Sequence, residues 1–368
     1  MKEEYPIIKV AAVQASPIYM NRDATVEKAC SLIEEAADNG AKIVAFPENY
    51  IAGYPYFYMT LLTNPFLEQG KWFRELFKSS VEVPSPATEK LCRVARNSNT
   101  YVIIGMNERD PLSMGTVYNS QLFIDNKGNI MGVHRKLAPT LTEKLVFARG
   151  DGSNLHLFKT EWGEMGGLIC GEHANSLAKF SLIARGEKIH VASWPAFPQK
   201  IFPEHQRETA LFRVRQHAHE GKLFIISSSG HFSQEMIDIL CHSDEEKARI
   251  QVGGGYSAII GVNGEFLAGP LFDQEGIVYA EINLEDIIEA KLSHDLLGHY
   301  SRFDVLSLNF NDEALVPIHY VRNKSSQADE LDRLVKDIKT KVDKIEERMN
   351  TFFGEKMTPR PEGAEDAK

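Results

Sequence analysis

The sequence predicts an α/β fold in which buried strands alternate with helices. Short apolar runs recur through the first 310 residues, and several end at a turn signal, which is typical of buried strands. Segments with apolar residues at helical spacing lie between these runs. The strands are apolar on both faces, which indicates sheets covered on both sides. Because no break in composition divides this part of the chain, we predict one domain over residues 1–310.

The first half of the domain begins with a largely β-branched apolar run over residues 7–13, which predicts a central strand. Residues 23–39 carry apolar side chains at helical spacing and end at Asn39-Gly40, a favourable helix C-terminus. The same two patterns then alternate along the chain. They predict strands over residues 43–46, 101–106 and 117–124, and a helix over residues 88–97.

The second half repeats this order after an apolar run that ends at Cys170. Asn175-Ser176 is a helix N-cap signal. The patterns predict helices over residues 177–185 and 207–220, and strands over residues 190–193 and 223–227. Residues 256–262, followed by Asn263-Gly264, and residues 277–282 predict a late hairpin-like pair of strands.

The end of the chain has a different pattern. A C-terminal extension over residues 311–353 contains a predicted heptad helix over about residues 327–350. Its apolar positions are spaced four, three, four, three and four residues apart: Leu331, Val335, Ile338, Val342, Ile345 and Met349. The helix either packs on its own domain or associates with a second copy. The Pro- and Glu-rich residues 354–368 are predicted to be disordered.

Composition excludes several classes of function. The net charge is −10 without a basic stripe, so we expect no nucleic-acid partner. No apolar stretch approaches 18 residues, and the N-terminus lacks the apolar core of a signal peptide, so we expect no membrane span and no secretion. The four cysteines are scattered, which argues against a disulfide framework and favours a reducing cytoplasm.

Cys170 is a candidate nucleophile because it follows a buried strand and precedes a helix, in Gly166-Gly167-Leu168-Ile169-Cys170-Gly171-Glu172-His173. A thiol near a helix N-terminus is expected to lean toward thiolate. The alternative is a small buried apolar residue. Two further strand ends supply the groups that such a nucleophile needs. Glu48 is a carboxylate whose pKa burial would raise, and Lys136 is a cation. Catalytic groups gather at strand ends in α/β sheets.

These residues resemble the nitrilase branch of the carbon–nitrogen hydrolase superfamily over about residues 10–311. The resemblance rests on five motifs: Ala11-Ala12-Val13-Gln14, Ala45-Phe46-Pro47-Glu48, His134-Arg135-Lys136-Leu137, Gly150-Asp151-Gly152-Ser153 and Gly298-His299-Tyr300-Ser301-Arg302. It implies a four-layer α-β-β-α sandwich of two mixed sheets flanked by helices. It also implies homo-oligomers built from dimers, which frequently extend into helical spirals.

The resemblance also implies roles for individual residues. Glu48 would be the general base, Lys136 would stabilise the tetrahedral species, and Cys170 would attack. Glu143 matches a second glutamate, expected to position substrate, although a solvated loop carboxylate is the alternative. The implied reaction converts a nitrile to the carboxylic acid and ammonia through a cysteine thioimidate and thioester. It needs no metal and no organic cofactor. Cyanide dihydratase or hydratase, aliphatic amidase and a non-catalytic assembly protein remain as alternatives.

Four residues are predicted to contact substrate. Tyr54 and Trp194 follow strand ends of the site, although both could belong to an aromatic core. Gly171 stands where many nitrilases carry tryptophan, so we expect it to influence substrate choice. His173 either contacts substrate or orients the turn. His217 and His219 lie two apart on a predicted helix and make a poor metal pair.

Overall fold

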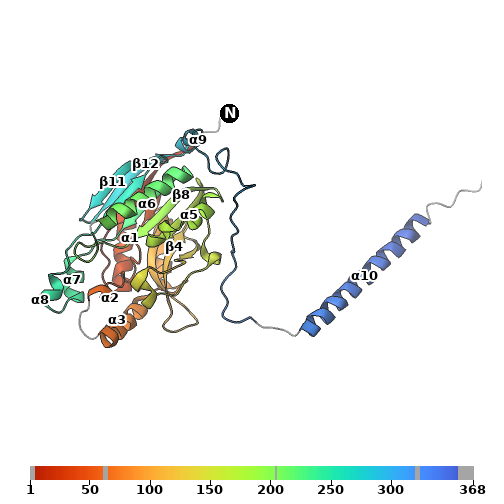
Figure 1. Ribbon diagram of the computed structural model, residues 1–368, viewed down its shortest axis with the longest axis horizontal. Coiled ribbons are helices and arrows are strands. Elements are labelled where there is room, and N and C mark those ends of the chain that lie inside the picture. Colours follow the sequence, from red (N-terminus) through yellow and green to blue (C-terminus); the bar gives the residue numbers. More distant parts are fainter. Residues whose placement is uncertain (1–4, 61–64, 204, 320–323, 355–368) are drawn as a thin grey trace, which may run out of the picture. The chain divides into compact units, whose positions relative to one another are not determined.

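The computed structural model describes residues 5–60, 65–203, 205–319 and 324–354 (Figure 1). The chain divides into a compact unit, Met1–Ala314, and a C-terminal unit, Leu315–Lys368. Each unit is described by itself. Of the tail predicted to be disordered, residues 355–368 lie outside the described residues.

The first unit contains two six-stranded mixed sheets. In the first sheet the strands lie in the order β12 (Gly276–Asn283), β1 (Ile7–Gln14), β2 (Ile43–Ala45), β3 (Tyr101–Arg109), β4 (Val117–Ile124) and β5 (Ile130–Arg135). In the second sheet the order is β11 (Phe266–Phe272), β10 (Tyr256–Ile260), β9 (Phe224–Ser229), β8 (Glu187–Trp194), β7 (Gly163–Ile169) and β6 (Phe158–Thr160). The central strands β1–β2–β3 and β7–β8–β9 are parallel, and the outer pairs are antiparallel.

Helices cover the outer face of each sheet. On the first sheet, α1 (Arg22–Asp38) and α4 (Pro86–Asn97) bury an apolar stripe against β1–β4, and Val26, Ile33 and Leu91 lie at its centre. On the second sheet, α5 (Ser176–Ile183) and α6 (His205–Gly221) pack on β8–β10 (Figure 1). The predicted N-cap of α5 is confirmed, because the Asn175 side chain accepts hydrogen bonds from the amides of Leu177 and Ala178.

The inner faces of the two sheets form a shared apolar core. Val10, Ile103 and Phe123 of the first sheet pack with Val191 and Ile226 of the second. Because successive side chains of a strand point to opposite faces, each central strand supplies both this core and the core beneath the helices. The predicted α-β-β-α sandwich of two mixed sheets is confirmed.

The structure also describes several shorter helical elements and α3. They are α2 (Phe57–Thr60), α3 (Pro65–Ser79), α7 (Gln234–Leu240), α8 (Asp244–Lys247), α9 (Glu285–Lys291) and the 3₁₀ helices η1 (Leu141–Leu145), η2 (Gly152–Asn154) and η3 (Cys170–Ala174). Side chains from α2, α3 and α7 form one apolar cluster with Tyr54 and Tyr56. This cluster stands beside the ends of the central strands, where the candidate site lies.

One predicted strand pairing is wrong. The strands β10 and β12 were expected to form a hairpin-like pair, but they belong to different sheets. The strand β11 intervenes and pairs with β10, whereas β12 pairs with β1. The strand β11 is largely exposed and therefore lacks the apolar run by which buried strands are recognised.

The C-terminal unit contains α10 (Lys324–Gly354), which spans the segment of the heptad pattern. Its apolar residues from Leu331 to Ile345 are exposed. No helix among the described residues is long and apolar enough to cross a membrane.

Candidate active site

Cys170 lies at the point where β7 turns into η3. Its backbone has a φ of 50°, in the left-handed region that side chains with a β-carbon rarely adopt. Such a conformation persists only where the surroundings hold it, and it is frequent at functional sites. Here the Cys170 carbonyl accepts a hydrogen bond from Nδ1 of His173 at 2.9 Å. The turn presents the sulfur at the end of a central parallel strand.

Glu172 connects this turn, through hydrogen bonds, to the loop that follows Lys136. Its buried carboxylate accepts hydrogen bonds from the amides of Ile169 and Leu137, each at 2.8 Å. Its oxygen Oε2 also lies 2.9 Å from Nε2 of His134. Because Leu137 directly follows Lys136, this one carboxylate joins the chain at the cysteine to the chain at the lysine. Sequence reasoning missed Glu172, whose partners are backbone amides that no spacing in the sequence reveals.

Lys136 extends from the end of β5 and is fully buried between two carboxylates. Its Nζ donates to Glu48 Oε1 and to Glu143 Oε2, both at 2.8 Å. The sequence predicted Glu48, Lys136 and Glu143 as site residues, and the structure brings these three side chains into contact. Burial alone would lower the pKa of Lys136, but the charges of Glu48 and Glu143 hold this pKa well above its ordinary value. The ammonium is thus a fixed positive charge.

Glu48 follows β2 and is buried beside Lys136. Oxygen Oε1 accepts from Lys136 and from the amide of Asn119 at 2.6 Å, while Oε2 has no hydrogen-bond partner among the described residues. Burial raises the pKa of Glu48 to about 7, against the pull of the nearby ammonium. The predicted direction of this shift is confirmed. One oxygen of Glu48 is therefore held in place while the other is able to take a proton.

Glu143 lies in η1 and is buried, so the alternative of a solvated loop carboxylate is wrong. Besides Lys136, it accepts hydrogen bonds from the hydroxyl of Tyr54 and from the amide of Thr140, each at 2.9 Å. These contacts hold the loop that carries Thr140 close to the two charged side chains.

The Cys170 sulfur is a thiol rather than a thiolate in this environment. Burial and the charge of Glu48 raise its pKa well above the ordinary value, although Lys136 and the amide of Gly171 act in the opposite direction. The expected lean toward thiolate is wrong. The positive end of a single 3₁₀ turn is too weak to offset desolvation beside two carboxylates.

A cavity of about 810 Å³ opens directly onto the cysteine. Tyr54, Glu143 and Cys170 belong to its lining. Most of the remaining wall is apolar and comprises Met59, Leu141, Pro195, Phe197, Ile201, Phe202 and Pro203. Of the four residues predicted to contact substrate, only Tyr54 is in this lining. Gly171 and His173 belong to the turn η3 but are not in the lining, and Trp194 stacks on His173.

Comparison with known proteins identifies the family. Residues 9–292 match the carbon–nitrogen hydrolase family. The chain belongs to the carbon–nitrogen hydrolase family. It is 40% identical over 328 residues to a nitrilase of Bacillus sp. (strain OxB-1), a match that covers 88% of this chain and 94% of the relative. It is 39% identical to an aliphatic nitrilase of Rhodococcus rhodochrous, with 87% of each chain covered.

A solved structure agrees with this assignment at the level of the fold. The carbon–nitrogen hydrolase of Helicobacter pylori G27 superposes with a TM-score of 0.60 and 24% identity, covering 78% of this chain and 93% of that one. The two-sheet sandwich described above is therefore the fold of carbon–nitrogen hydrolases.

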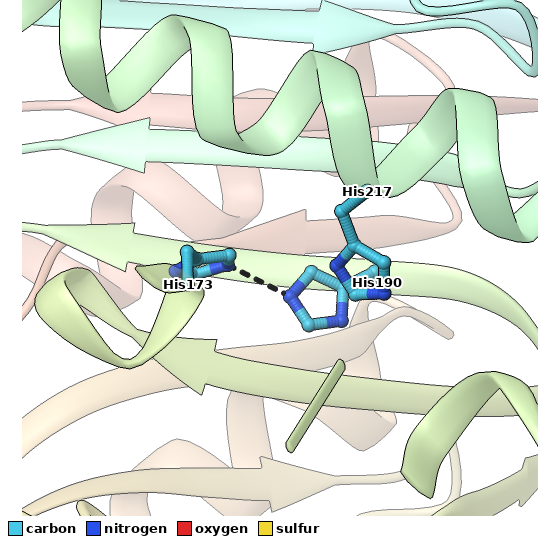
Figure 2. Close-up of side chains that lie close together, drawn as sticks. All are labelled: His173, His190 and His217. Carbon is cyan, nitrogen blue, oxygen red and sulfur yellow. Dashed lines mark hydrogen bonds between the residues drawn. The ribbon is translucent and has the colours of Figure 1, made fainter. Parts of the chain in front are cut away.

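This carbon–nitrogen hydrolase also holds a cluster of three buried imidazoles (Figure 2), one of which, His173, belongs to the turn that begins at Cys170. The ligand atoms of His173, His190 and His217 all lie within 4.8 Å of one another, a spacing compatible with a metal ion. The ring nitrogens of His173 and His190 are already engaged in hydrogen bonds, however. His219 lies on the exposed side of α6, so His217 and His219 do not share a face. The sequence did not reveal the cluster because η3, β8 and α6 each supply one ring.

Enlarging Gly171 is expected to disturb the site through one contact. A β-carbon at this position would lie 2.6 Å from Oγ1 of Thr140, whose amide binds Glu143. We expect Gly171→Ala to lower kcat/KM by about tenfold, because overpacking shifts such neighbours. In the double variant Thr140→Ala/Gly171→Ala the clashing Oγ1 is absent. Adding Thr140→Ala to Gly171→Ala should therefore restore most of the lost kcat/KM. Equal losses in the single and double variants, measured in a double-mutant cycle, would contradict this contact.

The buried Glu48 carboxylate should also make stability depend on pH. Its pKa is about 7 in the folded protein and 4.5 ordinarily, so between these values the folded state retains a proton that the unfolded chain has lost. The free energy of unfolding then falls by about 1.4 kcal/mol per pH unit as pH rises. Glu48→Gln removes this titration. As pH rises from 4.5 to about 7, we expect the free energy of unfolding of Glu48→Gln to increase by about 3 kcal/mol relative to that of the native protein, as measured by denaturant titration. Glu208→Gln, on the exposed face of α6, is the control. Parallel pH profiles for native protein and Glu48→Gln would refute the prediction.

Proposed function

We propose that this protein hydrolyses an organic nitrile to the carboxylic acid and ammonia, with Cys170 as the nucleophile. The observation that carries the proposal is the buried Lys136, held at 2.8 Å by both Glu48 and Glu143 beside the cavity that Cys170 lines. Relatives that are 40% and 39% identical to this chain are a nitrilase and an aliphatic nitrilase.

In the first step the Cys170 sulfur attacks the nitrile carbon. The S–H proton passes to the free oxygen of Glu48 as the S–C bond forms, and Glu48 then delivers it to the nitrile nitrogen. The product is a neutral thioimidate. A pKa near 7 suits Glu48 to this exchange, because such a group both accepts and returns a proton near neutral pH.

Water then adds to the thioimidate carbon, with Glu48 taking one of its protons. The Lys136 ammonium stabilises the tetrahedral species and stays charged throughout, since two carboxylates hold its proton. Protonation of nitrogen releases ammonia and leaves a thioester, which a second water hydrolyses to the acid. If the tetrahedral species expels sulfur instead, the product is the amide.

The cavity favours an organic nitrile over cyanide. A volume of about 810 Å³ lies in the range of pockets that bind whole small molecules, and its wall is mostly apolar. Cyanide has two heavy atoms and would leave this wall unfilled. We therefore place cyanide hydrolysis behind nitrile hydrolysis. Amide hydrolysis ranks behind it as well, because the relatives that are 40% and 39% identical are nitrilases.

The pH dependence of the rate should follow the buried carboxylates. Glu48 must be ionised to accept the thiol proton, so kcat/KM is expected to rise tenfold per pH unit up to about 7 and then level. This apparent pKa belongs to the coupled site of Glu48, Lys136 and Glu143. Enzyme held at pH 5.5 and assayed at pH 7.5 serves as the control for inactivation. If the rising part of the pH profile has an apparent pKa near 4.5, the ordinary value for glutamate, Glu48 is not the base.

A substrate panel tests the proposed function. Aliphatic, aromatic and arylaliphatic nitriles, an aliphatic amide and cyanide are each incubated with enzyme, and ammonia, acid and amide are quantified. We expect ammonia and acid in equal amounts from at least one organic nitrile. Turnover of cyanide or the amide alone would refute the assignment. The absence of any turnover would instead support a non-catalytic assembly protein.

We further propose that the protein is a cytoplasmic homo-oligomer. Free Cys30, Cys92, Cys170 and Cys241 fit a reducing compartment. The α10 residues Leu331, Val335 and Ile338 are exposed at heptad spacing, and a second copy of α10 would cover them. Truncation after Phe310 should then reduce the particle size in light scattering. An unchanged size would refute a role of α10 in assembly.

A further inference from the structure

A chain of buried polar groups runs from Glu187 through two histidines to the backbone of Cys170. Oε1 of Glu187 lies 2.7 Å from Nδ1 of His190. Nε2 of His190 lies 3.0 Å from Nε2 of His173 (Figure 2). Nδ1 of His173 lies 2.9 Å from the Cys170 carbonyl. The side chains of Glu187, His190 and His173 are all buried, and none lines the cavity beside Cys170.

The carbonyl at one end of the chain determines the direction of every hydrogen bond. A carbonyl only accepts, so Nδ1 of His173 carries a hydrogen and donates it. Burial lowers the pKa of His173 well below its ordinary value, so this ring is neutral and its Nε2 is an acceptor. His190 must therefore donate from Nε2, which leaves its Nδ1 as an acceptor facing Glu187.

The directions of these hydrogen bonds require Glu187 to donate from Oε1, so it is a protonated acid, and its other oxygen, Oε2, lies 3.2 Å from Nε2 of His217. Burial raises the pKa of Glu187 and lowers that of His190 to about 3, which favours the neutral form of both. A carboxylic acid then donates from Oε1 to Nδ1 of His190. The three hydrogen bonds all point toward Cys170, and none of the groups carries a charge.

Aromatic rings also pack against the two histidines of this hydrogen-bonded chain. The His173 ring stacks on Trp194 with centroids 4.9 Å apart and planes at 23°. The Trp194 carbonyl accepts from the amide of Glu48 at 3.1 Å, so one residue supports both His173 and the candidate base. His217 packs edge-on against His190 at 4.4 Å.

We propose that Glu187, His190 and His173 form a positioning relay that holds Cys170 in its left-handed conformation and thereby aims the sulfur at the substrate carbon. The relay does not touch substrate and transfers no proton during the reaction. It rests on the proposed function, because aiming matters only if Cys170 is the nucleophile. Misplacement of a nucleophile by about 1 Å is enough to lower a rate by about 100-fold.

The first test removes the hydrogen bond to the carbonyl while keeping the stacked ring. We expect His173→Phe to lower kcat by about 10- to 100-fold with KM within about threefold, because binding is retained and alignment is lost. His219→Phe, an exposed histidine on α6, is the matched control and should keep native kcat. Unchanged kcat in folded His173→Phe, or a loss confined to thermal stability, would overturn the proposal.

The second test asks whether a donor at position 187 is sufficient. A glutamine amide donates to Nδ1 of His190 as the acid does, so Glu187→Gln should keep kcat within about threefold. Glu187→Leu has no donor and should fall about as far as His173→Phe. Equal losses in Glu187→Gln and Glu187→Leu would overturn the relay, as would one equivalent of bound metal that His173→Phe loses.

A third measurement separates this proposal from the proposed function. The rate at which iodoacetamide alkylates Cys170, followed on its peptide by mass spectrometry, needs no nitrile turnover. Slower alkylation in His173→Phe, with rescue in Glu187→Gln relative to Glu187→Leu, supports the relay even if no nitrile is hydrolysed. Equal alkylation rates in all of these variants would overturn it even if nitriles are hydrolysed.

Discussion

Replacing Cys170 with alanine is expected to abolish nitrile turnover, with a loss in kcat on the order of 10⁵-fold or more. The loss is this large because no other described side chain among those lining the cavity is a cysteine or serine. The variant should still fold, since the side chain contributes little apolar area and makes no hydrogen bond that the turn requires. Ammonia release and thermal unfolding, measured on the same preparation, check both statements.

Cys30→Ala is the control for this substitution. Cys30 is a half-buried cysteine on α1, packed against the core of the first sheet. Its removal should leave kcat within about twofold, because it lies outside the cavity lining. Residual turnover of more than about 1% in Cys170→Ala would mean that another group attacks the nitrile.

Lys136→Met is expected to lower kcat by at least about 10³-fold and also to destabilise the fold. The catalytic loss follows from removal of the charge that faces the tetrahedral species. The loss of stability follows because Glu48 and Glu143 would remain buried with no cation between them, and breaking a buried pair in this way costs about 3–5 kcal/mol. The cost should be smaller at low pH, where the carboxylates are protonated.

Lys222→Met provides a matched control for that prediction. Lys222 directly follows α6 and is also buried, but its ammonium donates to Oδ1 of Asn263 at 3.2 Å. We expect native kcat and a smaller loss of stability in this variant. If the free energy of unfolding of Lys136→Met at pH 8, measured with denaturant, equals that of the native protein, the buried charge balance described here is incorrect.

Much of the fold could be predicted from the sequence because its central strands are buried on both faces. The strands β1, β2 and β8 therefore appear as apolar runs bounded by turn signals. The edge strand β11 could not be recognised in this way, since solvent covers much of it. The error in pairing β10 with β12 has the same origin. Which sheet a strand joins depends on partners far along the chain, and the pattern within one strand does not encode them.

The charged core of the site was predictable, but its supports were not. Glu48 and Lys136 follow β2 and β5 of the first sheet, Cys170 follows β7 of the second, and catalytic groups gather at strand ends in such α/β folds. Asn119 and Glu172 act through buried hydrogen bonds whose partners lie on other elements, and Glu187 reaches η3 only through His190. The state of the thiol was also beyond local reasoning. The local turn favours thiolate, whereas burial beside Glu48 favours the thiol.

The most direct test of the account is the identity of the covalent intermediate. Enzyme is mixed with an organic nitrile that it turns over, quenched in acid during the steady state, and digested for mass spectrometry. We predict that the peptide containing Cys170 gains the mass of the acyl group as a thioester. Turnover with Cys170 unmodified, or with the adduct on Cys30, Cys92 or Cys241, would contradict the central role assigned to Cys170.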